Sequence, residues 1–417
     1  MQNYTRRRFL ADVSASAATA GMISLAGSTP LFLTESAAAA AEQKGDNILV
    51  VVQLSGGNDG LNTVIPYKHE LYKKARPSLG QDAATVIKLK DDLGLHTALK
   101  GFGKLWEAGQ LAIVQGVGYP NPNRSHFESM DIWHTANLKI GDRTSGWLGR
   151  TFDRLKLDRP QLENAESSPA LHLGGEEQPL ALAARDVPTP SITSLDQFKL
   201  DTGRSEPRRQ AIETAAAAAR PAENDLLKFV ATRSTAALKL SHHLEQAAKE
   251  YSTNVKYPET QLAGKLKQVA QLIDAGLGNR VYYVTLDGFD THSEQAAAHQ
   301  GLLQQLGDAL FSFTEDLKAH GHAERVASLV FSEFGRRVQE NSSRGTDHGA
   351  AAPAFVIGSK VKAGLIGVHP KLDDLDDGDL KFHTDFRSVY SSLLTNWLKW
   401  PTQPGIADAV RSVELFS

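Results

Sequence analysis

The chain has 417 residues and a nearly balanced charge, with 45 lysines and arginines against 48 aspartates and glutamates. This balance lacks the basic excess typical of nucleic-acid-binding proteins, and we expect no nucleic-acid partner. The chain has no cysteine, which excludes disulfides, thiolate metal sites and cysteine nucleophiles, so any metal must be held by histidine nitrogen or oxygen ligands.

The N-terminus has the pattern of an export signal. Three arginines at positions 6–8 precede Phe9 and Leu10, and a weakly apolar stretch rich in alanine, glycine and serine follows. This order resembles the twin-arginine signal, and the alanines at 37–41 suit a signal peptidase. A basic, unstructured N-terminus is the alternative. We predict a cleaved signal peptide over residues 1–41, the twin-arginine export machinery as a partner, and a periplasmic or secreted mature protein.

The first element of the mature chain is a buried strand. Residues 48–54 form a continuous apolar run rich in β-branched side chains, as expected of a strand covered on both faces. A loop with the sequence SGGNDG follows, at the end of the strand where open α/β sheets bind ligands. Asp59 is therefore a candidate metal ligand, and the alternative is a turn aspartate among glycines. No later apolar run reaches the roughly 20 residues of a membrane helix, so we expect no membrane span in the mature protein.

A helix over 95–108 and a short strand over 111–116 come next. Ser125 follows that strand, at a position where a helix begins. Its hydroxyl has two interpretations. One is simple N-capping, which is common. The other is a nucleophile that projects from the helix N-terminus toward an anionic group.

The middle of the chain has a different composition. Residues 151–260 are rich in proline and glutamate at first, and then in alanine with helical periodicity. We predict that they form an insertion, or cap, over the edge of the sheet. No specificity signature is readable there.

The strand pattern then resumes. A strand over 281–286 leads to Asp290 and His292, and the next strand, in the segment RVASLVFSEFGRRVQE, ends in SEFGR with Glu333. Asp347 and His348 stand just before a strand over 354–357. If the sheet is parallel, the groups at the strand ends meet at one edge, and such a set of oxygen and nitrogen ligands suits a divalent metal. These ligand types favour zinc, magnesium, manganese or calcium over the metals of thiolate sites. The alternative for His348 is a structural role, as a hydrogen-bonded histidine of the core.

The order of these motifs resembles a bacterial exported family of unknown function, number 1501, which is similar to the alkaline phosphatase and sulfatase superfamily. The resemblance covers most of the chain after residue 47 and is strongest in the segments LSGGNDGLNTVIP, NRSHFESMDIW, LDGFDTH, SEFGR and TDHG. It implies an α/β fold over residues 47–417. The expected architecture is an alkaline-phosphatase-like three-layer sandwich, with a mostly parallel central sheet, helices on both faces and an inserted cap.

The resemblance also implies a site with two metals, commonly zinc, bridged by the phosphate or sulfate of the substrate. Asp290, His292 and His348 match the ligands of one metal, although the spacing of Asp290 and His292 is tighter than usual. An alternative alignment makes Asp347 and His348 the Asp–His pair of the other metal. In that alignment a late ligand comes from a histidine further along the chain, His369 or His383.

For the other metal, the preferred alignment gives Asp59, Ser125 and Glu333. Phe334 falls where the superfamily has a histidine, and a phenylalanine cannot bind a metal. This second site therefore has weaker ligation or uses another group, such as Asp347.

The mechanism implied by the resemblance is hydrolysis of a phosphate or sulfate ester with Ser125 as the nucleophile. A metal would lower the pKa of the hydroxyl and neutralise the substrate oxygens. Arg124 or Arg336 would stabilise charge in the transition state, and His126 would assist the leaving group or orient the loop.

A second hypothesis is a non-catalytic envelope binding protein on the same scaffold, with one metal or none. Phe334 favours this hypothesis, whereas the aligned acids, histidines and serine favour the enzyme. The expected ligand is a small anionic ester in the first case, and a polysaccharide or a partner protein in the second.

Overall fold

The computed structural model describes residues 46–139, 141, 143–158, 168–195, 251–403, 405–406 and 412–417. The predicted signal peptide lies outside these residues. The chain divides into two units, one made of Met1–Lys44 with Leu195–Lys249 and the other of Gly45–Ser194 with Glu250–Ser417. The elements and the site described below belong to the second unit.

A mainly parallel sheet forms the centre of this unit. Its strands in the described residues are β1 (Ile48–Leu54), β5 (Leu111–Gly118), β6 (Ala170–Leu173), β7 (Ser191–Ile192), β8 (Val281–Leu286), β9 (Val326–Ser332), β10 (Ala352–Ile357), β11 (Gly364–Ile366) and β14 (Thr384–Asp385). Their order is β11-β5-β10-β9-β1-β8-β6-β7, and β14 also pairs with β5. β10 runs antiparallel to β5 and β9, and the other pairs are parallel.

The central strands are the apolar runs of the sequence. All seven residues of β1 are buried, as expected for a strand paired on both sides and covered on both faces. Burial of each valine or leucine side chain contributes about 1.5–3 kcal/mol to folding. The predicted strands at 48–54 and 281–286 are confirmed, while β5 runs two residues beyond the predicted end and β10 begins two residues earlier.

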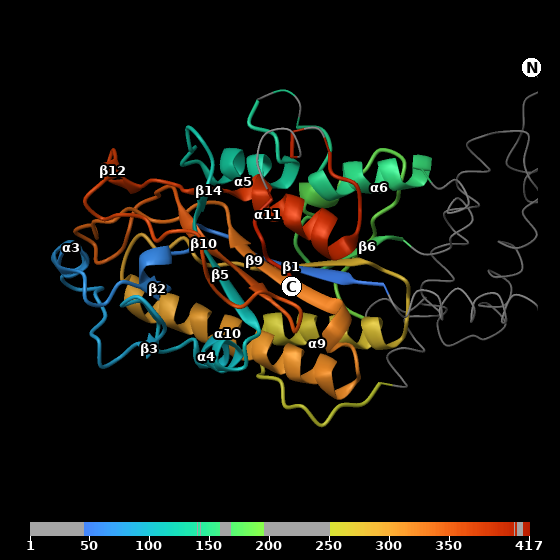
Figure 1. Ribbon diagram of the computed structural model, residues 1–417, viewed down its shortest axis with the longest axis horizontal. Helices are drawn as coiled ribbons and strands as arrows, with labels where there is room; N and C mark the ends of the chain where they lie inside the picture. Colours follow the sequence, from blue (N-terminus) through green and yellow to red (C-terminus); the bar gives the residue numbers. More distant parts are fainter. Residues whose placement is uncertain are drawn as a thin grey trace, which may run out of the picture. The chain divides into compact units, whose positions relative to one another are not determined.

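Helices cover both faces of the sheet (Figure 1). One face carries α4 (Lys100–Glu107), α9 (Gln261–Asp274) and α10 (Gln295–Ala319). The other carries α5 (His126–Thr135), α6 (Trp147–Asp158) and α11 (Phe386–Ser392), which continues into the π-helical turn η5 (Leu393–Leu398). The predicted α/β class, with a mainly parallel sheet between helices, is therefore confirmed. No described helix has the length and apolar character needed to cross a membrane.

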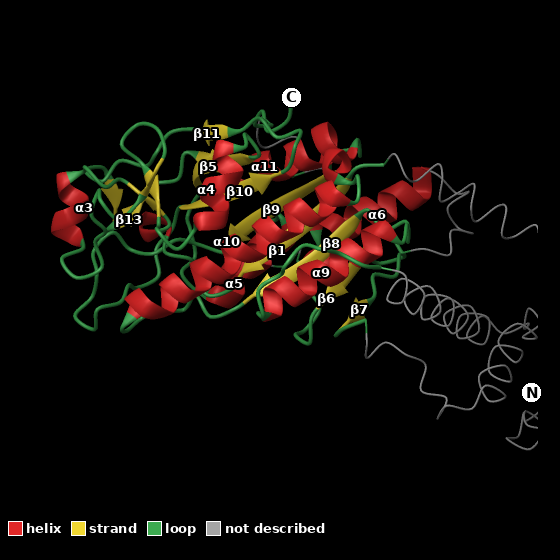
Figure 2. Ribbon diagram, turned by 90° about the horizontal axis from the view of Figure 1, so that it is seen from below, coloured by secondary structure: helices red, strands yellow, loops and turns green. Residues whose placement is uncertain are grey.

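Short elements surround the sheet (Figure 2). They are η1 (Gly60–Asn62), α3 (Glu70–Ala75), η3 (Leu180–Leu182), η4 (Ala323–Arg325), the three-stranded sheet of β2 (Val64–Ile65), β4 (Gly94–Leu95) and β3 (Ile87–Lys88), and the hairpin of β12 (Leu375–Asp376) and β13 (Asp379–Leu380). The helix predicted from residue 95 begins only at Lys100, because Leu95 pairs within β4.

The region predicted as an insertion contains part of the sheet. β6 pairs with β8, and β7 pairs with β6, so the chain between residues 170 and 192 extends the sheet instead of covering its edge. Residues 196–250 lie outside the described part of the chain, and an insertion there stays a prediction.

The direction of β10 decides which loops meet. Because β10 is antiparallel to β5 and β9, its first residue lies at the edge where those strands end. The segment before β10 therefore reaches the same edge as the loops that follow β5, β8 and β9.

Candidate metal centre

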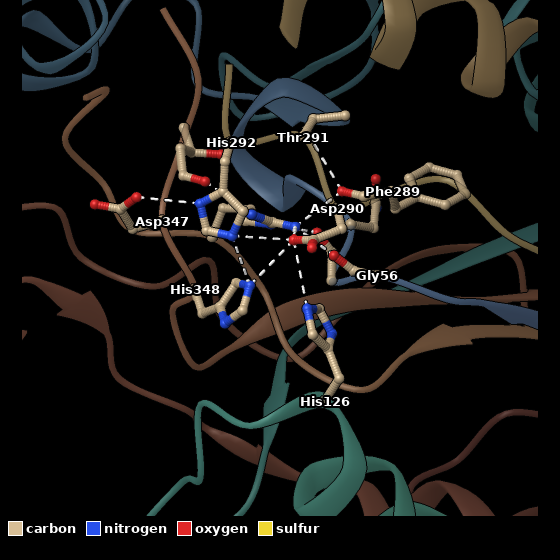
Figure 3. Close-up of polar contacts among 12 residues, drawn as sticks. Gly56, His126, Phe289, Asp290, Thr291, His292, Asp347 and His348 are labelled. Atoms are coloured by element: carbon tan, nitrogen blue, oxygen red, sulfur yellow. Dashed lines mark hydrogen bonds and ion pairs between the residues drawn. The ribbon is translucent and has the colours of Figure 1, made fainter. Parts of the chain in front are cut away.

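Three histidines point toward the carboxylate of Asp290 (Figure 3). The Nε2 atoms of His292 and His348 each lie 3.1 Å from Oδ1 of Asp290, and Nε2 of His126 lies 3.4 Å from it. The Nε2 atoms of His292 and His348 are 2.8 Å apart. In a tetrahedral zinc site with bonds of about 2.0–2.1 Å, the ligand atoms lie roughly 3.3 Å from one another. The four side chains thus have nearly the spacing of a metal site.

Each histidine comes from a different part of the chain. His126 is the first residue of α5, which follows β5, and Ser125 is the N-cap of that helix. His292 lies in the loop after β8, and His348 lies in the segment before β10, where it forms an isolated bridge with Arg336. The ligand-capable atoms of His126, Asp290 and His348 all lie within 4.8 Å of one another.

The second nitrogen of each ring is held by a hydrogen-bond acceptor. Nδ1 of His126 lies 2.8 Å from Oε1 of Glu333, and Nδ1 of His292 lies 3.2 Å from Oδ1 of Asp347. Nδ1 of His348 lies 2.8 Å from the carbonyl oxygen of Arg124. Because acceptors face all three Nδ1 atoms, these nitrogens carry the proton and the Nε2 atoms present lone pairs.

The donor set fits a divalent cation. Three imidazole lone pairs and a carboxylate oxygen repel one another unless a positive charge lies between them. Nε2 of His126 is buried and has no hydrogen-bond partner among the residues that the structure describes. Metal-binding histidines in proteins commonly donate their other N–H to a carboxylate or carbonyl, as all three do here. A site rich in imidazole favours zinc over magnesium or calcium.

Asp290 is held in its charged form. Burial alone raises its pKa, but chiefly the hydrogen bond from Arg336 outweighs burial and lowers the pKa of Asp290 to about 2. Nη2 of Arg336 lies 2.8 Å from Oδ1 of Asp290. The carboxylate is therefore ionised at neutral pH.

Arg336 itself is fully buried beneath the loops. Its Nε donates to the carbonyl of Gly57 and its Nη1 to that of Thr346, each at 2.7 Å, and its Nη2 also donates to Phe289 and Gly56. Its side chain has no exposed surface. Every nitrogen of the guanidinium is thus used within the protein, so Arg336 positions Asp290 and the loop after β1 and does not face a substrate.

Two predicted metal ligands, Glu333 and Asp347, contact the Nδ1 atoms of histidines of the cluster. Glu333 is buried, and besides His126 it accepts hydrogen bonds from the amide of Gly56 at 2.9 Å and from Oγ of Ser332 at 3.0 Å. Asp347 orients His292 in the same way. The hydrogen bond with Glu333 raises the pKa of His126, which makes its imidazole a stronger base and a better donor to a metal.

Phe334 packs against two of the histidines. Its ring centroid lies 4.9 Å from those of both His126 and His348. Gly57, with φ of +75°, leaves room for this ring, because a Cβ there would lie 2.3 Å from Cε2 of Phe334. Because the ring centroids of His126 and His348 are themselves 4.3 Å apart, Phe334 packs against the pair of imidazoles and supplies no ligand atom.

Asp59, predicted as a ligand of the second metal, is not among the side chains that form the cluster. It is buried, and its two oxygens accept from Nη1 of Arg76 at 2.5 Å and from Nη2 of Arg76 at 3.1 Å, while Gln295 also donates to it. Burial raises the pKa of Asp59, but the charge and hydrogen bonds of Arg76 outweigh it, and the net shift is downward. A cation of the protein itself thus occupies both oxygens. Sequence reasoning missed Arg76, since no motif surrounds it.

The predicted catalytic serine is close to the cluster along the chain. Ser125 is exposed and caps α5 by position, but its side chain makes no capping hydrogen bond. The simple capping interpretation is therefore wrong for its hydroxyl. Arg124 donates to Asp379 from Nε at 2.9 Å and from Nη2 at 2.7 Å, and to Asp377 at 3.0 Å. The alternative ligands His369 and His383 are not members of the metal-capable cluster found among the described residues.

The sequence matches a family model described as "Protein of unknown function (DUF1501)" over residues 46–376. The chain belongs to this family. The resemblance drawn from its motifs is thereby confirmed. No curated protein matches the sequence.

Distant likenesses are found among solved structures. They include the C-terminal periplasmic domain of EcEptC from Escherichia coli in complex with Zn, with 10% identity and a TM-score of 0.36 over 76% of this chain and 74% of that one. The PsFucS1 sulfatase from Pseudoalteromonas sp. has 11% identity and a TM-score of 0.34, over 80% and 66%. The lipoteichoic acid synthase LtaP from Listeria monocytogenes has 8% identity and a TM-score of 0.34, over 79% and 74%. These values are too low to transfer a ligand or a reaction.

Proposed function

We propose that this protein is a metal-dependent hydrolase of phosphate or sulfate esters, with Ser125 as the nucleophile. His126, Asp290, His292 and His348 would hold one zinc ion. The observation that carries the proposal is that the Nε2 atoms of three histidines lie close to one carboxylate oxygen, while the Nδ1 atom of each ring faces a hydrogen-bond acceptor.

The exposure of the centre supports a catalytic over a purely structural metal. The side chain of Asp290 is 48% exposed and that of His292 is 44% exposed. A structural zinc site is closed, whereas a catalytic site stays open to a substrate. A divalent ion bound here would lower the pKa of a neighbouring hydroxyl and offset charge on the oxygens of the ester.

The position of Ser125 in the chain supports its proposed role as the nucleophile. Its backbone lies between Arg124, whose carbonyl holds His348, and His126, so the serine is at the edge of the cluster. The first amides of α5 and the helix dipole favour an anion there. In the proposed reaction the serine oxygen bonds to phosphorus or sulfur as the alcohol leaves, and water then releases the group from Ser125.

Of the two arginines predicted to stabilise charge, Arg124 carries this role in our proposal. Its side chain is 38% exposed, and its carbonyl contacts the cluster through His348. Arg336 keeps Asp290 in place, as its buried hydrogen bonds support.

The central experiment measures metal content and turnover separately. Protein purified without chelator is expected to contain one zinc and to hydrolyse generic aryl phosphates or sulfates. The Ser125→Ala variant should keep the zinc and lose turnover, while the control Ser412→Ala, at an exposed serine near the C-terminus, should keep both. Full activity in Ser125→Ala would rule out the serine as nucleophile, and a wild-type protein without metal would rule out the centre.

A second candidate is a non-catalytic envelope protein that uses the metal only to bind an anionic ester or a polysaccharide. The pairing of Asp59 with Arg76 and the packing of Phe334 favour it, because neither residue then serves a second metal. Bound zinc without turnover on any aryl phosphate or sulfate would support this candidate over the hydrolase.

We also propose export through the twin-arginine pathway to the periplasm or beyond. The arginines at positions 6–8, followed by Phe9 and Leu10, support it. Replacement of Arg6 and Arg7 by lysine should retain the precursor inside the cell, as cell fractionation would measure. Unchanged export of that variant would contradict the proposal.

A further inference from the structure

The hairpin of β12 and β13 places an exposed carboxylate between two arginines. Oδ2 of Asp377 lies 3.0 Å from Nη2 of Arg124 and 3.3 Å from Nη2 of Arg337. The side chain of Asp377 is 75% exposed, and its φ of 51° places it in the turn of the hairpin. Because exposed ion pairs contribute little stability, this carboxylate is easily replaced by another anion.

Both arginines are fixed beside the metal centre by their backbones. The carbonyl of Arg124 accepts from Nδ1 of His348 at 2.8 Å, and the amide of Arg337 donates to the carbonyl of Asp347 at 3.0 Å. His348 belongs to the cluster and Asp347 orients His292. The backbones of both arginines are thus tied to the segments that carry the metal centre.

The net charge of the two arginines and their two aspartate partners is compatible with a bound anion. Asp379, whose side chain is 3% exposed, accepts from Arg124 at 2.7 Å and lies 3.8 Å from Nε of Arg337. Asp379 is a fixed part of the fold and offsets one of the two positive charges. Asp377 offsets the other from the solvent side. Without Asp377 the group carries one net positive charge on planar donors that match the oxygens of sulfate, phosphate or carboxylate.

We propose that Arg124 and Arg337 form a subsite for a second oxyanion group of the substrate, and that the carboxylate of Asp377 occupies this subsite until the substrate replaces it. The inference rests on the proposed function for the adjoining centre. It specifies the substrate class as an ester within a polyanion, such as a multiply sulfated or acidic saccharide, in preference to an ester of a neutral alcohol.

The first test measures the binding of inorganic sulfate to metal-free protein by calorimetry. Asp377→Asn should tighten binding roughly fivefold, because it removes the competing charge. Arg337→Gln in the Asp377→Asn background should abolish the gain. The matched control is Asp92→Asn, which removes the same charge from an exposed pair with Lys68 and should change nothing. Equal gains in Asp377→Asn and Asp92→Asn, or no gain in either, would overturn the subsite.

A second test separates a substrate subsite from a site for free anions. Zinc-loaded wild-type protein should bind a disulfated disaccharide more tightly than its monosulfated counterpart, and Arg337→Gln should remove that preference. Binding of free sulfate without any preference between the two saccharides would overturn the role in substrate recognition. If the protein binds no zinc, the centre is refuted, whereas the sulfate titration on metal-free protein still tests the subsite by itself.

Discussion

Asp290 and Asp59 both follow a strand of the parallel sheet, and both are predicted metal ligands, but the structure surrounds them differently. Asp59 is buried and meets only donors, chiefly the two Nη atoms of Arg76. Asp290 is half-exposed, accepts one hydrogen bond from Arg336, and lies near the Nε2 atoms of three histidines. Arg76 neutralises the carboxylate of Asp59, whereas the carboxylate of Asp290 can still bind a cation.

The difference shows what makes a carboxylate a metal ligand. Position at the end of a strand is shared by both residues, so it does not decide the role. The neighbouring groups decide it, because a carboxylate saturated by a guanidinium has no lone pair directed at a metal, whereas one that faces lone pairs requires a cation. The following predictions test this contrast, from the largest expected effect to the smallest.

Removal of Arg76 should have the largest effect on stability. Arg76→Ala leaves the buried charge of Asp59 unpaired, and such changes cost about 3–5 kcal/mol of unfolding free energy. Urea unfolding would measure the loss. Lys68→Ala, which breaks the exposed pair with Asp92, is the control and should leave the unfolding free energy nearly unchanged. Equal losses of unfolding free energy in the two variants would contradict the structural role that we assign to the carboxylate of Asp59.

Asp290→Asn should act on the metal instead of the fold. We expect zinc affinity to fall by more than about 100-fold, since the loss of an outer partner alone costs 10–100-fold. The metal-free variant should lose less unfolding free energy than Arg76→Ala, because the asparagine oxygen can still accept a hydrogen bond from buried Arg336. Competition with a chromophoric chelator measures the affinity. Zinc binding as tight as in the wild type would exclude Asp290 as a ligand.

Glu333→Gln should have a smaller effect on the same centre. The amide still fits the buried site, but it orients His126 less firmly and makes its imidazole a weaker base, so zinc affinity should fall by about 10–100-fold. Glu340→Gln is a matched control, because Glu340 holds Ser78 and Leu79 and no histidine. A loss beyond that of Asp290→Asn would indicate that Glu333 binds the metal directly.

His134 offers a contrast among the histidines, because it is buried without a charged partner. Burial lowers the pKa of His134 to about 3, from the ordinary value of 6.5. Below pH 6.5 His134 is protonated in the unfolded chain but stays neutral in the folded chain. The free energy of unfolding is therefore highest above pH 6.5 and falls as the pH decreases toward 3.

The expected loss from His134 is about 1 kcal/mol between pH 6.5 and 5.5. His134→Gln, whose amide also donates to Gln53, should show a shallower decline in unfolding free energy over this range. Equal slopes for the two proteins would indicate that His134 is protonated in the folded state.

Much of the fold and part of the site follow from the sequence. The runs at 48–54 and 281–286 are long enough and apolar enough to specify buried strands, and Ser125 is at a helix start. The motifs place most of the grouped acids and histidines near one sheet edge. His126, predicted to assist a leaving group or orient the loop, instead lies among the metal-capable side chains.

The assignment of each side chain depends on tertiary structure. Nothing near Arg76 in the sequence indicates that it reaches Asp59, and nothing near Glu333 indicates that its carboxylate lies behind an imidazole from another loop. Local pattern determines strands and helix starts, because burial and capping act over a few residues. Whether an acid binds a metal, a guanidinium or a histidine depends on partners brought together only by the reversed strand β10 and the loops around it, and so only the folded chain decides it.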